Sequence, residues 1–371
     1  MIHIRSVDLF KVQLPLKIPF ETSSARIDAK TFLVCRVNDG SGVSVWSECV
    51  AKQIPNYMPE TVDTASVILT KHVIPLMLNQ SFDTPMAMTD FIQRHVKGNR
   101  MAVASMDMAA WAIMAEKNQQ SLSAYIGGSK TLIPCGLSIG IASSFDETCD
   151  QISTAIQDGY KKIKLKIKPG HDVPLLESVR RKFPTIPLMV DANNAYTLDD
   201  LDTLQAMDDF DLLMMEQPLR WDDIVDHSLC QAVLKTPICL DESIMHVNHV
   251  KNSVRCNSAK IINIKPGRVG GFTESMRIHD YCQSINMPVW CGGMLESGIG
   301  RAYNVALASL PQCSIPGDIS PSSRYWHEDI IEHPWCMNAD GMMTVPSSVG
   351  IGVTVNEQVL DRYTIDRWTV S

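Results

Sequence analysis

The sequence lacks the marks of several protein classes. No apolar run approaches the roughly 18 to 20 residues that span a bilayer, and the first residues have no apolar stretch and cleavage site of a signal peptide. The 11 cysteines include no C-x-x-C pair and no metal-type spacing with histidine. Lys and Arg number 33 against 41 acidic residues, for a net charge of −8. The chain therefore has no excess of basic residues with which to bind nucleic acid. We therefore expect a cytoplasmic protein with no membrane or nucleic-acid partner.

The first part of the chain has the pattern of an α+β domain. At about 150 residues per domain, 371 residues allow two or three domains, or one barrel with an extension. Strand-like alternation comes first and helical periodicity follows. A stripe of Met and Trp on the last helix is interpreted as core packing rather than a cofactor site. We predict strands at 2–14, 31–37 and 43–48, the last two as a hairpin, and helices at 59–78, 84–95 and 100–118.

From Ile133 onward, strand-like and helical stretches alternate regularly. Each of eight short apolar runs is followed by a stretch long enough for a helix, which is typical of a parallel sheet, and eight such units close a barrel. The runs are LIPCGLSIG, KIKLKI, PLMVDAN, DLLMMEQP, PICLDES, KIINIKPG, PVWCGG and SIPGDIS.

Five ionisable residues lie near the ends of five consecutive runs. Their separations are 25, 25, 25 and 24 residues, or one strand–helix unit each. We therefore expect them at one height, at the carboxyl ends of neighbouring strands, where barrel enzymes build their active sites. The five are Lys166, Asp191, Glu216, Asp241 and Lys265.

The three carboxylates predict a metal site. Adjacent carboxylates would repel one another and raise their own pKa values unless a cation lay between them. Oxygen ligands of this kind suit Mg²⁺ or Mn²⁺ rather than zinc. The alternative, that they are ordinary strand-terminal carboxylates capping the next helix, is weaker for three in register flanked by two lysines.

The segment KKIKLKIKPG places lysine at every second position. By itself this pattern also suits an edge strand with one solvent-facing side. A closed barrel has no such side, so Lys164 and Lys166 should point into its mouth. Crowding there by each other and by a cation would lower a lysine pKa, and such a lysine can act as a base.

Motifs along nearly the whole chain resemble the enolase superfamily, in the branch of o-succinylbenzoate synthase and N-succinylamino acid (N-acylamino acid) racemase. The resemblance implies an α/β fold: a modified TIM barrel, (β/α)7β, at 126–320, with an α+β capping domain at 1–125 on which the tail at 321–371 packs back. The motifs are PLKIPFETS, IKLKIKPG, VDANNAYT, MEQPL, ICLDES, NIKPGRVGG, WCGGMLESGIGRA and PGDIS.

The resemblance also implies roles for the five residues. Asp191, Glu216 and Asp241 would bind the metal. Lys166 would take the proton α to a carboxylate, and Lys265 would be its counterpart on the opposite face of the substrate. The metal would stabilise the enediolate that forms.

Further positions would contact the substrate or tune specificity. Lys164 and Asn193 would lie at its carboxylate, and Phe20 and the loop around Tyr57 would cover its far end. Arg268 would tune Lys265 towards racemisation, or else form a surface salt bridge. Lys52 would pair with a second carboxylate or, more simply, be a solvated loop lysine. Other candidates at strand ends are Ser138, Gly293, Met294 and Leu295.

Two reactions follow from one intermediate. The first is dehydration of 2-succinyl-6-hydroxy-2,4-cyclohexadiene-1-carboxylate to 2-succinylbenzoate in menaquinone biosynthesis, and the alternative is racemisation of N-acylamino acids. A dipeptide epimerase, another acid-sugar dehydratase and a non-catalytic binding barrel are weaker alternatives, the last because both lysines are present. We also expect a homo-oligomer acting on a small carboxylate.

Overall fold

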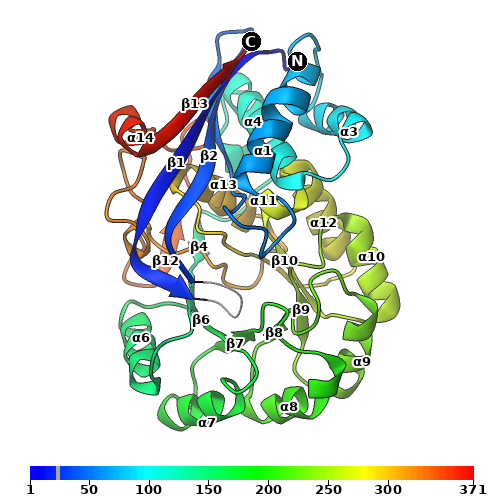
Figure 1. Cartoon of the computed structure of the whole chain (residues 1–371), viewed down its shortest axis with the longest axis vertical. Coiled ribbons are helices and arrows are strands. Elements are labelled where there is room, and N and C mark those ends of the chain that lie inside the picture. Colours follow the sequence, from blue (N-terminus) through cyan, green and yellow to red (C-terminus); the bar gives the residue numbers. More distant parts are fainter. Residues whose placement is uncertain (22–25) are drawn as a thin grey trace.

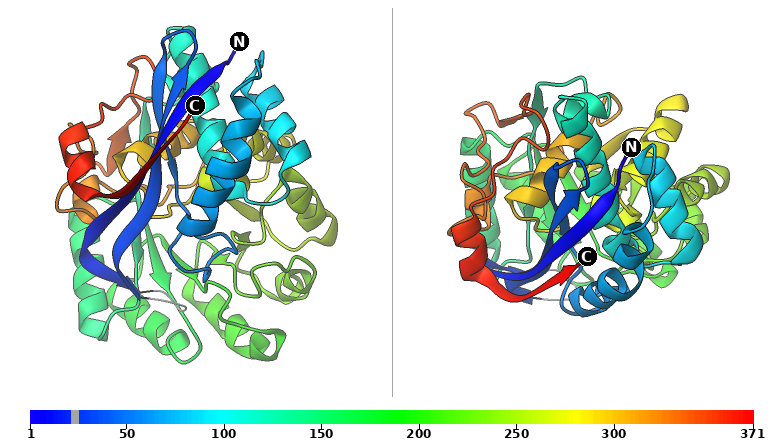
Figure 2. Two further views of the ribbon diagram at one scale, coloured as in Figure 1. Left: turned by 45° about the horizontal axis from the view of Figure 1, so that its top comes forward. Right: turned by 90° about the horizontal axis from the view of Figure 1, so that it is seen from above.

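An antiparallel sheet joins the two ends of the chain. The structure is a computed structural model that describes residues 1–21 and 26–371, so the end of the PLKIPFETS motif lies outside the described residues. The C-terminal strand runs beside the N-terminal strand, with Val370 opposite Val7 (Figures 1 and 2). The predicted hairpin is confirmed as the pair β2–β3. The sheet order is β13-β1-β2-β3, with β1 at Ile4–Glu21, β2 at Arg26–Asp39, β3 at Ser44–Cys49 and β13 at Thr364–Val370.

The predicted helices of the first domain form, with one irregularity. The stretch predicted at 59–78 contains a π-helical turn, η1, between two α-helices. Pro75 follows that turn and has no amide hydrogen to donate, which disfavours a regular ladder there. The helices are α1 (Val62–Ile68), η1 (Leu69–Val73), α2 (Ile74–Met77), α3 (Pro85–His95), α4 (Arg100–Lys117) and α5 (Leu122–Tyr125).

Seven of the eight predicted runs form one parallel sheet, in the order β11-β10-β9-β8-β7-β6-β5. The eighth run and the residue before it bridge both edges of that sheet, with Cys313 opposite Val289 of β11 and Gly317 opposite Cys135 beside β5. The ring of eight is thereby closed. The strands are β5 (Gly136–Ile139), β6 (Lys162–Lys166), β7 (Leu188–Asp191), β8 (Met215–Glu216), β9 (Ile238–Leu240), β10 (Ile261–Ile264) and β11 (Val289–Cys291).

Helices follow the barrel strands and surround the ring, as Figure 1 shows for α6 to α10. A small antiparallel pair, β4 (Leu132–Pro134) and β12 (Met342–Thr344), lies outside the barrel sheet. The helices are α6 (Phe145–Gln157), α7 (Val173–Lys182), η2 (Leu198–Asp200), α8 (Leu201–Ala206), η3 (Met207–Phe210), α9 (Val225–Val233), α10 (Val247–Cys256), α11 (Pro266–Val269), α12 (Phe272–Ser284), α13 (Gly298–Ala308), η4 (Ser322–Arg324) and α14 (Glu357–Tyr363).

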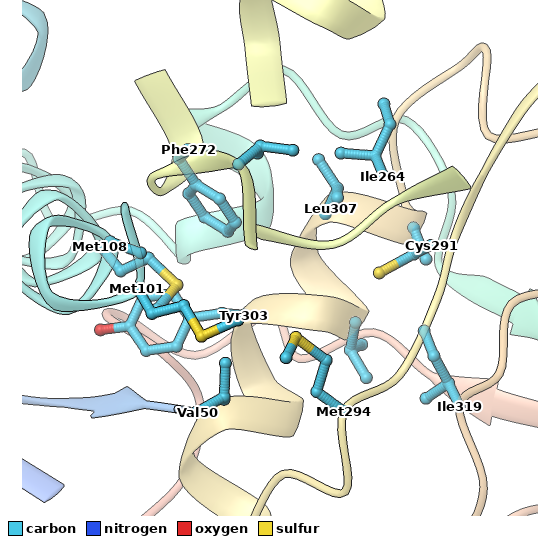
Figure 3. Close-up of a cluster of buried hydrophobic side chains, with 14 of the residues drawn as sticks. Val50, Met101, Met108, Ile264, Phe272, Cys291, Met294, Tyr303, Leu307 and Ile319 are labelled. Atoms are coloured by element: carbon cyan, nitrogen blue, oxygen red, sulfur yellow. The ribbon is translucent and has the colours of Figure 1, made fainter. Parts of the chain in front are cut away.

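The Met-rich face of α4 is part of the core between cap and barrel. Figure 3 shows Met101 and Met108 beside Tyr303 and Phe272, whose rings meet edge to face at 5.6 Å. Trp111 belongs to the same buried cluster. The interpretation of the Met and Trp stripe as core is therefore confirmed. Among the described residues, no helix combines the length and apolarity required to cross a bilayer.

Candidate active site

The five predicted residues meet at the carboxyl edge of the parallel sheet. In the register of neighbouring strands, Lys166 lies opposite Asp191 and Asp191 lies opposite Glu216. Asp241 directly follows β9, and Lys265 directly follows β10. The constant spacing in sequence therefore corresponds to a constant height in the barrel.

Lys166 and Lys265 stand on opposite sides of the ring. Lys166 ends the second member of the ring, β6, and Lys265 follows the sixth, β10, so that β7, β8 and β9 lie between them. Four places in a closed ring of eight amount to half a turn. Both side chains line the same cavity, which encloses about 690 Å³ including its mouth.

Asp191 and Glu216 are paired with lysines of β6. Lys166 Nζ donates a 2.6 Å hydrogen bond to Asp191 Oδ2, and Lys164 Nζ donates one of 3.0 Å to Glu216 Oε2. Lys164 Nζ also lies 3.2 Å from Asp191 Oδ2. Both carboxylates are buried, with 1% and 0% of their surface exposed. Unpaired charge would be costly at this depth, so the lysines stabilise the carboxylates.

Asp241 is held from three sides. Lys265 Nζ donates to Asp241 Oδ2 at 2.6 Å, and the Tyr57 hydroxyl lies 3.3 Å from the same oxygen. Arg268 Nη1 donates to Asp241 Oδ1. Arg268 has none of its surface exposed, and it also donates to the carbonyl of Ile244 at 2.9 Å. The alternative of a surface salt bridge for Arg268 is therefore wrong, because both Arg268 and Asp241, the carboxylate it contacts, are fully buried.

The two lysines at opposite sides of the ring differ in acidity. Burial lowers the pKa of Lys166 below its ordinary value, and Lys164 adds to this effect while Asp191 opposes it. Burial also acts to lower the pKa of Lys265, but Tyr57 and nearby carboxylates, Glu216 among them, raise it above its ordinary value. Their surroundings therefore favour loss of a proton from Lys166 and retention of a proton on Lys265.

The lysines also separate the pKa values of the carboxylates. Burial acts to raise the pKa of Asp191, but Lys166 and Lys164 bring it well below its ordinary value. Burial and the charge of Asp191 raise the pKa of Glu216. A further cation beside Glu216 would relieve that repulsion.

The donor set suits a hard divalent cation. Three buried carboxylates from neighbouring strand ends provide oxygen ligands only. Within residues 1–21 and 26–371, no three Asp, Glu, His or Cys side chains are gathered closely enough to enclose an ion. Each of the three is turned instead towards an ammonium or guanidinium group. The residues fit the metal in chemical type and lie at neighbouring strand ends, and their role as its ligands stays a prediction.

Most of the predicted substrate-contacting residues line the cavity. Phe20 and Tyr57 reach it from the cap, and Asn193 and the loop of Gly293, Met294 and Leu295 reach it from the barrel. Lys52, for which a solvated position was the simpler interpretation, also lines it.

Three predicted residues do not line the cavity. Lys164 and Arg268 lie beneath it, against the carboxylates. Ser138 lies opposite Lys164 in the sheet, and its hydroxyl is buried without a hydrogen-bond partner among the described residues. Their roles as substrate contacts stay predictions, and their positions favour support of the site over direct contact.

Two buried carboxylates near the site were missed by the sequence reasoning. Glu242 lines the cavity and accepts a 3.1 Å hydrogen bond from Asn193 Nδ2. Asp318 contacts the ammonium groups of both Lys162 and Lys164. Glu242 follows Asp241 in sequence, and Asp318 lies in the PGDIS motif. The sequence places both residues in the motifs of the site. It does not show which lysine or amide side chains each carboxylate contacts.

The backbone around the cavity is locally constrained. Leu295, whose side chain lines the cavity, has φ of 57°, and Asn193 has φ of 42°. Left-handed backbone is uncommon for leucine and concentrates at functional sites. At Gly292, a Cβ would lie 2.6 Å from Cε of Lys265, so only glycine lets that lysine occupy its position.

A capped α/β barrel with two lysines facing each other above three acidic strand ends defines a member of the enolase superfamily. Family models match the chain as "Mandelate racemase / muconate lactonizing enzyme, N-terminal domain" over residues 4–127 and as "Enolase C-terminal domain-like" over residues 147–359.

Similar proteins show to which family within this superfamily the chain belongs. An o-succinylbenzoate synthase of Bacillus subtilis is 46% identical, covering 98% of this chain and 97% of its own. An N-succinylamino acid racemase of Amycolatopsis sp is 40% identical, covering 97% of each chain. The crystal structure of an enolase superfamily member from Listeria innocua superposes with a TM-score of 0.96 at 36% identity, covering 100% of this chain and 99% of that one. The chain is an enzyme of the o-succinylbenzoate synthase and N-succinylamino acid racemase family.

Proposed function

We propose that the protein is an o-succinylbenzoate synthase, which dehydrates 2-succinyl-6-hydroxy-2,4-cyclohexadiene-1-carboxylate to 2-succinylbenzoate. The observation that carries the proposal is the pair Lys166 and Lys265, half a turn apart on the ring and lining one cavity. The identity of 46% to a synthase over nearly the full chain supports it.

In this proposal Lys166 removes the proton α to the substrate carboxylate. Its Nζ is fixed by Asp191 Oδ2 and Asn193 Oδ1, both at 2.6 Å, so the base is held in one place. For a syn elimination the proton that Lys166 takes is returned to the departing hydroxyl on the same face. Lys265 stays protonated opposite and stabilises the negative charge that develops.

Asp191, Glu216 and Asp241 would bind Mg²⁺, or Mn²⁺. When bound, this ion neutralises the charge that gathers on the substrate carboxylate as the α-proton leaves. The proposal places the enzyme in menaquinone biosynthesis, in the cytoplasm, and as a homo-oligomer.

Racemisation of N-succinylamino acids is the second candidate. Both lysines have access to the cavity, so one can take a proton from one face of the substrate while the other supplies a proton to the opposite face. The 40% identity to a racemase supports this activity beside the first. A single α-proton abstraction begins both reactions, so one site can perform both.

The test is to incubate the purified protein and Mg²⁺ with each substrate. Dehydration is followed by formation of the aromatic product, and racemisation by loss of the α-proton NMR signal in D₂O. We expect dehydration, with proton exchange on N-succinylamino acids. Absence of dehydration together with exchange would make racemisation the activity, and absence of both would overturn the proposal.

A further inference from the structure

Glu242 is a buried carboxylate on the cavity wall that the proposed reaction does not yet use. It comes two residues after β9, has none of its surface exposed, and lines the same cavity as Lys166 and Lys265. Burying a carboxylate is costly unless hydrogen bonds or neighbouring charges compensate. The contacts of Glu242 therefore indicate its role.

Glu242 is linked to Lys166 through the side chain of Asn193. Glu242 Oε1 accepts a 3.1 Å hydrogen bond from Asn193 Nδ2, and Asn193 Oδ1 accepts a 2.6 Å hydrogen bond from Lys166 Nζ. The three residues lie at the ends of β9, β7 and β6, so the link joins strands that are not all neighbours in the sheet. One amide thus connects Glu242 with the proposed base.

The two neighbours determine which way the amide of Asn193 faces. A carboxylate can only accept hydrogen bonds, whereas an ammonium group can only donate them. The amide therefore turns its nitrogen to Glu242 and its oxygen to Lys166. The backbone of Asn193 is held separately, because its N–H donates to Asp191 Oδ1 at 3.0 Å. Glu242 thus stabilises one of the two orientations open to the amide.

This orientation matters for a lysine that acts as a base. A neutral amine has two N–H groups and one lone pair, and the lone pair must be free to take the substrate proton. Asp191 Oδ2 and Asn193 Oδ1, both 2.6 Å from Lys166 Nζ, can accept those two N–H groups. With the amide reversed, an N–H group of Asn193 would face Nζ and compete with the substrate for the lone pair.

We propose that Glu242 is a positioning residue for Lys166, on which it acts through the amide of Asn193. This inference rests on the proposed function, since that function makes Lys166 the base. In this role Glu242 supplies a hydrogen-bond acceptor. A neutral side chain with an acceptor at the same place would serve as well.

A different role would follow if Glu242 acted by its charge. Burial acts to lower the pKa of Lys265, and Glu242 is among the neighbouring groups that raise it. Loss of that charge would alter proton transfer by Lys265 rather than by Lys166. Substitutions that keep or remove the acceptor, measured separately for the two lysines, distinguish these roles.

The test measures initial rates of α-proton exchange in D₂O, at saturating Mg²⁺, for each enantiomer of N-succinylphenylalanine. The enantiomer that still exchanges in Lys265→Ala is the one whose proton Lys166 removes. For this enantiomer we expect Glu242→Met, which removes the acceptor, to lower kcat by about 10- to 100-fold with little change in KM. Exchange of the other enantiomer should change little.

Two variants complete the comparison. Glu242→Gln keeps an acceptor without the charge, so it should retain most of the exchange that Glu242→Met loses. Glu177→Met is the matched control, since it removes an exposed glutamate of α7. Dehydration begins with the same abstraction by Lys166, so its kcat should fall in Glu242→Met and be largely retained in Glu242→Gln. A loss in Glu242→Gln as large as in Glu242→Met, an equal loss for both enantiomers, or no loss at all would overturn the assignment.

A second comparison does not depend on the folding of Glu242→Met, which circular dichroism checks. Asn193→Asp removes the N–H group that Glu242 accepts, and it should slow exchange of the enantiomer that Lys166 serves. Adding Glu242→Gln returns a donor to the link and should recover part of the rate for this enantiomer. A double variant no faster than Asn193→Asp would overturn the inference. Absence of exchange by the wild type on either enantiomer, with no dehydration, would instead overturn the proposed function.

Discussion

Lys166 and Lys265 face each other across the barrel, and each donates a 2.6 Å hydrogen bond to a different buried aspartate. Asp191 serves one lysine and Asp241 the other. The two lysines proposed to transfer protons therefore have separate anionic partners, although they share a cavity. Each lysine can be altered while the other keeps its own support.

Removal of each lysine should therefore affect one face of the substrate. We expect Lys166→Ala and Lys265→Ala each to abolish racemisation, with residual exchange on only one enantiomer, opposite in the two variants. Loss of the base should lower the dehydration rate of Lys166→Ala by about 10²- to 10⁴-fold. The measurement is NMR exchange on separate enantiomers in D₂O, with the exposed Lys161→Ala as control. Residual exchange on the same enantiomer in both variants would contradict the arrangement.

Arg268 should matter more for racemisation than for dehydration. Its guanidinium shares Asp241 with Lys265, which weakens the hold of that carboxylate on the lysine proton. In Arg268→Met, Asp241 would retain the proton on Lys265 more strongly. We expect racemisation to slow by about 10-fold, the equivalent of one pKa unit, and dehydration, where Lys265 need only stay charged, to slow less.

The ratio of the two activities is the measurement for Arg268, and Arg268→Lys, which keeps the charge, is the matched variant. An equal loss of both activities in Arg268→Met would indicate a structural role alone.

Asp318 should be required for stability as well as activity. It is the carboxylate shared by Lys162 and Lys164, and Lys162 is fully buried, with its Nζ 3.6 Å from the ring centroid of Trp290. Removing one partner of a buried ionic group leaves uncompensated charge, so Asp318→Asn should lower the free energy of unfolding by about 3–5 kcal/mol.

Urea denaturation measures this change, with the exposed Asp158→Asn as control. Adding Lys162→Met to Asp318→Asn should recover part of the loss, because one unpaired charge disappears. A double variant as unstable as the sum of the single variants would show that the charges are not coupled.

Asp107 should make the stability of the protein depend on pH. It accepts hydrogen bonds from the Thr89 hydroxyl at 2.5 Å and from Thr273 N at 3.1 Å, which joins the cap to α12. Burial raises the pKa of Asp107 from 3.8 to about 6. The folded state thus binds the proton more tightly than the unfolded chain, and the stabilisation by protonation is lost as pH rises from about 4 through about 6.

We expect Asp107→Asn to flatten this part of the pH profile, by up to about 3 kcal/mol from a shift of roughly two pKa units. Urea midpoints between pH 4 and pH 7 provide the measurement, and the exposed Asp146→Asn is the control. Identical profiles for the wild type and Asp107→Asn would contradict the raised pKa.

Removal of the metal by chelation should abolish activity without unfolding the protein. Because Asp191, Glu216 and Asp241 each have a cationic partner, metal removal would not leave them as isolated buried charges. We expect dialysis against EDTA to abolish turnover but to lower Tm by no more than about 5 °C. Mg²⁺ or Mn²⁺ should restore turnover. Unfolding on chelation would show that the lysines cannot stabilise the carboxylates alone.

The positions of the five ionisable residues at the strand ends could be predicted from sequence because strand–helix units have nearly constant length. Spacings of about 25 residues place Asp191 and Glu216 in register, as β7 and β8 show. The predicted strands and the Met-rich core helix followed from periodicity in the same way. Such local regularities need no knowledge of which distant segments meet.

Contacts between distant segments could not be predicted in this way. The burial of Arg268 depends on carbonyls of Asn263 and Ile244 that turn towards it, and Asp318 meets β6 only because the last segment closes the ring. The cavity position of Lys52 depends on how the cap lies over the barrel. These features arise from tertiary packing, for which a single sequence has no periodic signal.

The closed ring and the antiparallel cap divide the cavity wall between two separately built parts of the chain. Lys166, Lys265 and the acidic strand ends are anchored in barrel strands, while Lys52, Asn56 and Tyr57 belong to the cap. Evolution could therefore alter the cap side of the cavity by changing a few residues at 52–57, while the lysines and carboxylates of the barrel stay unchanged. A library confined to those positions would be an economical route to enzymes that accept new acyl chains.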